Sequence, residues 1–444
     1  MSDAEEYSGM PPHGAEQLAG GLRCAAVSDV GMRRSNNQDS MALSLADNPE
    51  RFASRGHLLM VADGMGAHAA GELASQMAAD TIPHSYHKRV DSPPGQAIVE
   101  AVVEANNLIY AKGQNSVDFQ GMGTTCSCLL LLETGAMAAH VGDSRVYRLR
   151  DDRFEQLTFD HSLVWEIAAA GQASEEEVPA YVPKNVITRS LGPHPTVSVD
   201  LEGPFPVQTG DKYLLCSDGL TGPLGPELIG MVLGALPPAE ASQTLVDLAN
   251  LLGGPDNITV VAAEVCDHKR MGECISCEDP CGATVSSGKT GWSVGPLATG
   301  LGAAAAGVAA AVGQPIVAGG FVVLALAACG YWLATGRSHQ PAATGGDSQL
   351  AGKAPYRTHP CEPSAEKIAT LIDIVRQLED LEDQTDWDFD WTPIHEDRQG
   401  AYQAMAGGDY RQAVVSYSSA VRRMMRALRE HGSSKSSDSS VDLT

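Results

Sequence analysis

Aspartates recur at the ends of apolar runs in this chain, and their type and spacing could bind divalent metal ions. Asp63 follows LMVA and Asp218 follows LLCS, each just before a glycine, and Asp143 lies in HVGDSR. Asp256 begins DNITVV, and Asp39 ends RRSNNQD. Singly, each is more typical of a turn, because Asp-Gly and Pro-Asp-Asn are favoured turn sequences. Together, acids at the ends of neighbouring strands converge on one rim of a sheet. Carboxylates without His or Cys nearby select Mg²⁺ or Mn²⁺ over zinc.

Short strands between Gly- and Asp-containing turns must position these aspartates. Buried strands are predicted in four apolar runs, HLLMVAD (57–63), TTCSCLLLL (124–132), KYLLCSD (212–218) and ITVVAAEV (258–265). Apolar residues at helical spacing predict helices from residue 73 and over 96–110, 162–170 and 241–252. Many strands with few β-α-β alternations favour an α+β sandwich over a doubly wound sheet.

Eight short segments between residues 22 and 265 together resemble a known enzyme family. In order they are SDVGMRRSNNQDS, VADGMGAHAAGELAS, GMGTT, HVGDSRVYRLR, FDHSLV, VITRSLG, YLLCSDGLTG and GPDNITVV. The set is similar to the type 2C, metal-dependent (PPM family) protein serine/threonine phosphatases in their bacterial form. The resemblance implies a four-layer α-β-β-α sandwich of two antiparallel sheets flanked by helices. It also implies a binuclear metal centre at one end of the sheets.

The resemblance assigns ligand roles to five positions. Asp63 would bridge two Mn²⁺ or Mg²⁺ ions, and the carbonyl of Gly64 would bind one of them. Asp218 and Asp256 would complete the other ion, while Asp39 would support the pair indirectly. A water shared by two divalent ions loses its proton near neutral pH and can attack phosphorus in line. The implied activity is therefore hydrolysis of phosphoserine and phosphothreonine.

Further positions carry roles toward the substrate in the same resemblance. Asp143 would help to hold a third, weaker ion. Arg34, rather than the adjacent Arg33, stands where the family binds phosphate, and a planar guanidinium can grip two phosphate oxygens. His68 is a candidate general acid or a loop-ordering residue. Gln38 stands where many relatives have Glu, which removes one water-mediated carboxylate contact. Residues 169–189 correspond to the flap that shapes substrate access.

Composition divides the chain of 444 residues into seven predicted regions. They are a flexible tail (1–20), the catalytic domain (21–266), a Cys/Gly-rich linker (267–294), a membrane segment (295–336, best span 316–334), a linker (337–363), a helical tail with a tetratricopeptide-like hairpin (364–430) and a disordered Ser-rich end (431–444). A net charge of -25 argues against nucleic acid as a partner, because phosphate backbones require a basic face.

The membrane segment is predicted from its lack of charge. Residues 290–336 contain no Asp, Glu, Lys, Arg or His, and 316–334 have roughly the 20 residues that a helix needs to cross hydrocarbon. The run 297–313 is mostly Ala and Gly, which contribute little to insertion, so a single crossing is expected, with a two-helix hairpin as the alternative. The N-terminus lacks a secretory signal. We therefore expect attachment to the lipid of the cell membrane, with the catalytic domain in the cytoplasm.

Three alternatives stay open at this stage. Cys266, His268, Cys274, Cys277 and Cys281 could form a zinc site or belong to a reduced linker. The chain could be a catalytically weak membrane adaptor, or a regulator of one partner built on a phosphatase fold. The expected partners are phosphorylated proteins, among them a serine/threonine kinase or its targets, and a protein that binds the helical tail.

Overall fold

The computed structural model describes residues 16–66, 69–170, 186–272, 352–379 and 390–438. The chain divides into two compact units, and every described element belongs to the unit made of Met1–Asp279 and Leu350–Thr444. The other unit, Pro280–Gln349, lies outside the described residues.

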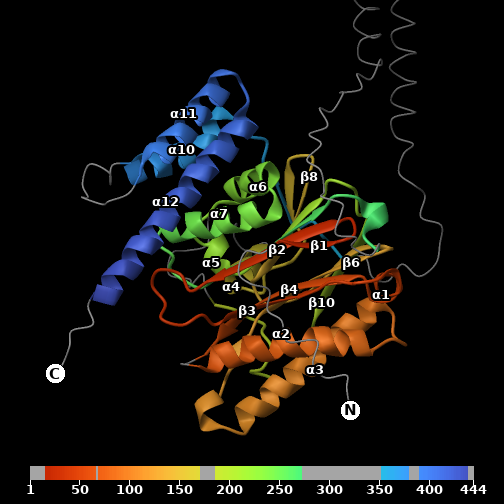
Figure 1. The fold of residues 1–444 in the computed structure, drawn as a ribbon. Coiled ribbons are helices and arrows are strands. Elements are labelled where there is room, and N and C mark those ends of the chain that lie inside the picture. Colours follow the sequence, from red (N-terminus) through yellow and green to blue (C-terminus); the bar gives the residue numbers. More distant parts are fainter. Residues whose placement is uncertain (1–15, 67–68, 171–185, 273–351, 380–389, 439–444) are drawn as a thin grey trace, which may run out of the picture. The chain divides into compact units, whose positions relative to one another are not determined.

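Two antiparallel sheets form the centre of the described unit (Figure 1). The seven-stranded sheet has the order β1 (Gln17–Ala19), β2 (Leu22–Asp29), β12 (Ile258–Val265), β11 (Lys212–Cys216), β8 (Arg145–Arg150), β9 (Arg153–Gln156) and β13 (Arg357–Pro360). The six-stranded sheet has the order β10 (Asp200–Phe205), β7 (Gly135–Val141), β6 (Cys126–Leu132), β4 (His57–Met65) and β3 (Asp39–Ser44), with β5 (Gly123–Thr124) paired to β4.

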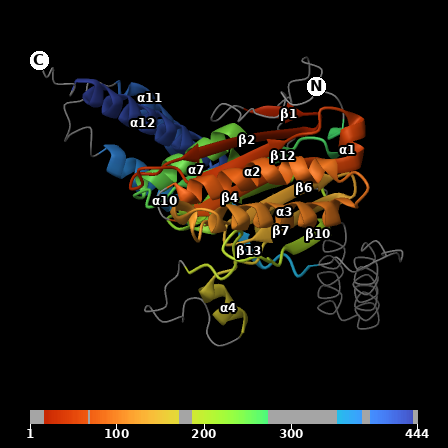
Figure 2. The same cartoon turned by 90° about the horizontal axis from the view of Figure 1, so that it is seen from below.

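Helices cover the outer faces of both sheets. On the six-stranded sheet lie α2 (Ala70–Lys88) and α3 (Pro94–Gln114), side by side in Figure 2. On the seven-stranded sheet lie α6 (Pro226–Ala235) and α7 (Pro238–Leu251). The shorter helices are α1 (Pro49–Arg55), α4 (Leu163–Ala169), α5 (Asp218–Thr221) and the 3₁₀ turns η1 (Val117–Phe119) and η2 (His268–Arg270). The predicted arrangement of two antiparallel sheets flanked by helices is confirmed.

The burial pattern explains the continuous apolar strands. β6 is buried at every position because one of its faces meets α2 and α3 while the other meets the second sheet. Leu129 and Leu131 face the inter-sheet cluster with Leu215 and Val261, whereas Leu130 belongs to the cluster under the helices. A strand between two covered faces needs no polar side, and its sequence therefore shows no alternation.

C-terminal segments add to this sandwich. Residues 357–360, assigned by sequence to a linker, form β13 and pair with β9 at the edge of the seven-stranded sheet. The segment carries no apolar periodicity, and Pro360 is tolerated because the strand is an edge strand. Three helices follow, α10 (Ala365–Glu379), α11 (Thr392–Ala406) and α12 (Tyr410–Asp438). Their apolar residues share one core with α6 and α7, and Figure 1 shows α12 running beside α7.

This packing bears on the membrane prediction. Within the part of the chain that the structure describes, no helix combines the length and apolar character that a bilayer crossing needs. The predicted segment 295–336 lies outside that part. β13 and α10–α12 follow the segment in sequence, yet they pack on the catalytic elements that precede it. A single crossing would put the two on opposite sides of a membrane, whereas an even number of crossings would leave them on the same side.

Candidate metal centre

Asp39 and Asp63 face each other across two neighbouring strands. They are paired residues in the register of β3 and β4, where β3 begins. The Asp63 backbone is fixed on its other side, because its N–H donates to Thr125 Oγ1 (2.8 Å) and its carbonyl accepts from Thr124 Oγ1 (2.9 Å). Gly64 follows Asp63 at a position where another backbone segment approaches closely. A Cβ at this position would lie 2.1 Å from the carbonyl oxygen of Gly71. The strand pair therefore fixes the backbone of both aspartates, and the close approach of α2 requires glycine at position 64.

Asp218 and Asp256 come from the other sheet. Asp218 begins α5 directly after β11, and Asp256 lies just before β12, the antiparallel neighbour of β11. Ser217 joins the two sheets at this point. Its hydroxyl donates to Asp39 Oδ2 (2.7 Å) and accepts from the backbone N–H of Thr259 (3.0 Å). The four aspartates thus gather where the ends of both sheets meet.

The surroundings of these four aspartates make it unfavourable for all four carboxyls to be ionised together. Burial raises the pKa of Asp39 to about 7, and the charges of Asp218 and Asp256 add to that rise although hydrogen bonds from Ser217 and Thr259 oppose it. Burial, and then the charge of Asp39, hold the pKa of Asp63 well above its usual range. The pKa of Asp218 is raised by burial and by the nearby Asp256. Carboxylates this close ionise together only when cations compensate them.

Asp143 stands in the turn between β7 and β8. Burial and the charge of Asp218 raise its pKa to about 7. One oxygen each of Asp39, Asp143 and Asp218 is buried without a hydrogen-bond partner. A buried polar atom without a hydrogen-bond partner destabilises the fold by about 1–3 kcal/mol. Coordination of a cation by these aspartate oxygens would remove that cost. An all-oxygen donor set suits Mg²⁺ or Mn²⁺.

Some oxygens of these aspartates have hydrogen-bond partners within the protein. Among the described residues, no three or more His, Cys, Asp or Glu side chains are arranged to hold a metal ion. Asp256 Oδ2 instead accepts from Arg34 Nη2 at 2.7 Å, and Asp39 Oδ2 accepts from Ser217. Ligation by Asp256 would therefore exchange the guanidinium of Arg34 for an ion.

The loop of residues 30–38 carries Arg34 to the centre. Asn257 holds this loop, because its amide donates to the carbonyls of Val30 and Asn36 (both 2.9 Å) and its Oδ1 accepts from the N–H of Gln38 (2.8 Å). Arg34 reaches Asp256 with a half-exposed side chain, 49% accessible, so it is open to a ligand. The guanidinium of Arg33 lies instead beside Gly253. Of the two arginines, it is Arg34 that contacts one of the four aspartates.

Several residues predicted from the sequence lie outside the part of the chain that the structure describes. His68 lies outside the described residues, as do residues 171–185 of the predicted flap. Cys274, Cys277 and Cys281 of the open zinc alternative also lie outside them, while Cys266 is a partly buried residue just before η2. Sequence reasoning missed Ser217 and Asn257. Ser217 precedes Asp218 in CSDG, and Asn257 follows Asp256 in PDN. In both motifs only the aspartate was considered as a functional residue.

Known proteins match this chain over the two-sheet unit. A model of the family "Protein phosphatase 2C" matches residues 32–249. A putative protein phosphatase 2C-type of Streptococcus pyogenes is 39% identical over 243 residues, which are 54% of this chain and 96% of that protein. Serine/threonine protein phosphatase PstP of Mycobacterium tuberculosis is 38% identical over 56% of this chain, which spans 46% of its length. A solved structure of the PstP catalytic domain, in complex with two manganese ions, is 37% identical with a TM-score of 0.46, covering 55% of this chain and 99% of that one.

Proposed function

This chain belongs to the protein phosphatase 2C family, and we propose that it hydrolyses phosphoserine and phosphothreonine in proteins at the centre formed by Asp39, Asp63, Asp218 and Asp256. It is a metal-dependent protein serine/threonine phosphatase that uses Mn²⁺ or Mg²⁺. One observation carries the assignment of the centre. Buried aspartates from both sheets repel one another, and three of the buried aspartate oxygens at this end of the sheets have no partner.

Different residues of this chain would bind the metal ions and orient the substrate phosphate. Asp63 would hold both ions, the Gly64 carbonyl would bind one of them, and Asp218 and Asp256 would bind the other. When bound, the ions supply a deprotonated water as nucleophile and neutralise phosphate charge. Arg34 grips phosphate oxygens and holds them in line for attack, because its planar fork donates two parallel hydrogen bonds.

Burial raises the pKa values of Asp39 and Asp143 to about 7, so ion binding near neutral pH should displace protons from part of the molecules. Ser217 keeps Asp39 turned toward the centre, and Asn257 keeps the Arg34 loop against β12. For Asp143 we propose a weaker, third ion, and for His68 the role of general acid.

The test uses the full chain, because removal of β13 and α10–α12 would expose the apolar faces of α6 and α7. Purified protein should release phosphate from a phosphothreonine peptide with Mn²⁺ and stop with EDTA. Asp218→Asn should remove nearly all turnover, while Asp390→Asn, a fully exposed acid before α11, serves as the matched control. A chain that binds the peptide without turning it over would be the adaptor instead.

We propose membrane attachment through residues 295–336, with the catalytic unit in the cytoplasm. The packing of β13 and α10–α12 on the catalytic elements supports an even number of crossings, so the runs 297–313 and 316–334 would form a hairpin. Full-length protein should then resist carbonate extraction, and Leu324→Arg should weaken insertion by roughly 3 kcal/mol while Leu324→Ile does not. Protease added to spheroplasts should cut neither end. Trimming of the helical tail would refute the hairpin, and recovery without detergent in the soluble fraction would refute attachment.

For partners we propose phosphoproteins of the cytoplasm, including a cognate serine/threonine kinase. The apolar faces of α10 and α12 already pack on the catalytic unit. A protein that binds the helical tail would therefore meet its exposed surface, or compete with α6 and α7.

A further inference from the structure

We propose that α12 of the helical tail positions the loop that carries Arg34, through an ion pair between Arg429 and Asp29. Given the proposed phosphatase function, on which this inference rests, Arg429 is a positioning residue for the substrate phosphate. It does not touch the phosphate itself but holds the loop from which Arg34 reaches it. The affinity for phosphate would thus depend on the docked position of α12.

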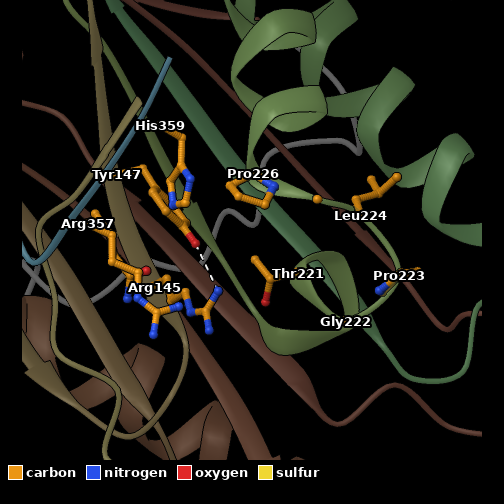
Figure 3. A pocket seen from close by; sticks show the side chains of 11 residues that line it. Arg145, Tyr147, Thr221, Gly222, Pro223, Leu224, Pro226, Arg357 and His359 are labelled. Atoms are coloured by element: carbon orange, nitrogen blue, oxygen red, sulfur yellow. Dashed lines mark hydrogen bonds between the residues drawn. The ribbon is translucent and has the colours of Figure 1, made fainter. Parts of the chain in front are cut away.

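The C-terminal part of the chain contacts the catalytic elements at β13 and at α12. Arg357 and His359 of β13 line a cavity of about 280 Å³ next to the end of α5 (Figure 3). On α12, Arg429 approaches the end of β2, where the Arg34 loop begins. β13 and α12 both lie beyond residues 32–249, the part that the family model matches. The contact of Arg429 is therefore an addition of the C-terminal part to the catalytic unit.

Arg429 lies between two acids that come from different elements. Its Nη2 lies 2.7 Å from Oδ1 of Asp247 on α7 and 3.8 Å from Oδ2 of Asp29, the last residue of β2. Burial raises the pKa of Asp247, the charge of Arg429 lowers it, and the charge of Asp29 raises it. The two acids are thus close enough to repel each other, and the guanidinium of Arg429 compensates both charges.

Asp29 in turn holds the start of the Arg34 loop. Its Oδ1 accepts from the N–H of Gly31 (2.8 Å) and from Nδ2 of Asn250 on α7 (3.1 Å). Gly31 lies against the backbone of Asp256, since a Cβ at Gly31 would be 2.1 Å from the Asp256 carbonyl oxygen. The carboxyl of Asp29 therefore fixes the loop beside the aspartate that Arg34 contacts.

The next residues of the loop are bonded to the turn after α7. The N–H groups of Met32 and Arg33 donate to the Gly254 carbonyl at 2.9 and 3.2 Å. Arg34 follows directly in the sequence. Its backbone position therefore depends on how the end of β2 and the turn after α7 lie relative to each other. α12 packs on α7 through the shared apolar core, so Arg429 joins the two elements from a fixed support.

Loss of Arg429 would act on phosphate binding through this geometry. Asp29 and Asp247 would repel each other without a compensating charge, and the start of the loop would move away from α7. A displaced Arg34 could not keep two parallel hydrogen bonds to phosphate oxygens, because a bidentate contact depends on orientation. Phosphate affinity should therefore fall, while kcat, which depends on the aspartate centre, should change less.

The test measures phosphate binding by the full chain with Mn²⁺. Inorganic phosphate serves as a competitive inhibitor of 4-nitrophenyl phosphate hydrolysis, and KM is measured for a phosphothreonine peptide. Arg429→Met should raise the phosphate Ki and the peptide KM roughly three- to tenfold and change kcat less than about twofold. Arg429→Lys keeps a positive charge between the two acids and should restore most of the affinity. Circular dichroism verifies that each variant is folded at the assay temperature.

The matched control is Arg422→Met on the same helix. Arg422 pairs with Glu240 of α7 (2.5 Å) and donates to Thr244 (2.8 Å) about two helical turns before Arg429. It joins the same two helices at a distance from Asp29, so its loss should change the phosphate Ki less than about twofold. An equal rise in Ki for Arg422→Met and Arg429→Met would overturn the proposal, because it would show a general loosening of the tail.

A double-mutant cycle separates positioning from general stability. In the Arg34→Ala background no guanidinium is left to be positioned, so adding Arg429→Met should leave the phosphate Ki unchanged. A rise in that background as large as in the unmodified protein, or no rise in Arg429→Met alone, overturns the proposal while Mn²⁺-dependent hydrolysis leaves the phosphatase intact. Absence of Mn²⁺-dependent hydrolysis in the unmodified protein overturns the proposed function, and this proposal with it.

Discussion

Arg429 on α12 should stabilise the catalytic unit through a buried acid on α7. Its Nη2 lies 2.7 Å from Oδ1 of Asp247, whose side chain is 1% exposed and whose Oδ2 has no hydrogen-bond partner. Removing one partner of a buried ion pair costs about 3–5 kcal/mol. Because the Arg429 side chain is 44% exposed, solvent reduces this cost, and we expect Arg429→Met to lower the free energy of unfolding by roughly 1.5–3 kcal/mol.

A double-mutant cycle isolates the pair. Replacing both partners, Arg429→Met with Asp247→Leu, should recover most of the loss, because no buried charge is left unpaired. The control is Arg423→Met, whose pair with Asp397 lies within the helical tail and has a half-exposed arginine, so its loss should be about 0.5 kcal/mol. Urea unfolding of the metal-loaded chain measures all five proteins: the unmodified chain, both single variants, the double variant and Arg423→Met.

The pH dependence adds a second test of the same contact. Burial raises the pKa of Asp247, and Arg429 opposes that rise. Without Arg429 the folded pKa rises further above the unfolded value, so the penalty for ionising Asp247 appears as pH increases. Arg429→Met should therefore cost more at pH 8 than at pH 5. An equal cost for Arg429→Met and Arg423→Met, or no coupling in the cycle, would refute the reasoning.

Three further predictions concern the metal centre. Arg34→Ala should lower kcat/KM for a phosphopeptide ~30- to 150-fold. Arg34→Lys should recover only part of this loss, because an ammonium cannot form two parallel hydrogen bonds to phosphate. Equal activity of the unmodified protein and both variants would contradict the phosphate role. Without metal, stability should fall as pH rises from about 4 to 7, since the pKa values of about 7 for Asp39 and Asp143 exceed the unfolded values and the folded state binds more protons. Urea unfolding in EDTA should show this fall, and a rise would oppose it. Gly64→Ala should abolish Mn²⁺ binding measured by calorimetry, because the new Cβ would lie 2.1 Å from the Gly71 carbonyl oxygen and displace the backbone. Unchanged binding would show that the backbone at position 64 can accept a side chain.

The sequence predicted the local elements and most of the centre for identifiable reasons. Regular apolar spacing over 96–110 marks α3, and Pro94 at its first turn extends it to Pro94–Gln114. Aspartates at the ends of β4 and β11 were expected to converge, and antiparallel pairing brings Asp39 opposite Asp63. Such local elements can be predicted because a helix or strand is determined largely by residues a few positions apart, and this shows as a periodic apolar pattern.

Contacts between distant segments could not be predicted in this way. Ser217 and Asp39 are 178 positions apart, and nothing local marks a serine as the link between two sheets. The amphipathic stripe of α10 shows that one face is buried, but not that it is buried against the catalytic unit. β13 is four residues long and has no apolar pattern, so only its pairing with β9 defines it as a strand.

Manganese binding and turnover, measured together in Asp63→Asn, test the central claim most directly. Titration calorimetry of the full chain should show two Mn²⁺ ions per molecule, and addition of the ions should start phosphothreonine hydrolysis. Asp63 is paired with Asp39 across β3 and β4, and the charge of Asp218 also raises its pKa, so its carboxylate lies near both halves of the centre. Asp63→Asn should therefore lose at least one ion and nearly all turnover at the same time. Binding of both ions with undiminished turnover in Asp63→Asn would contradict the account.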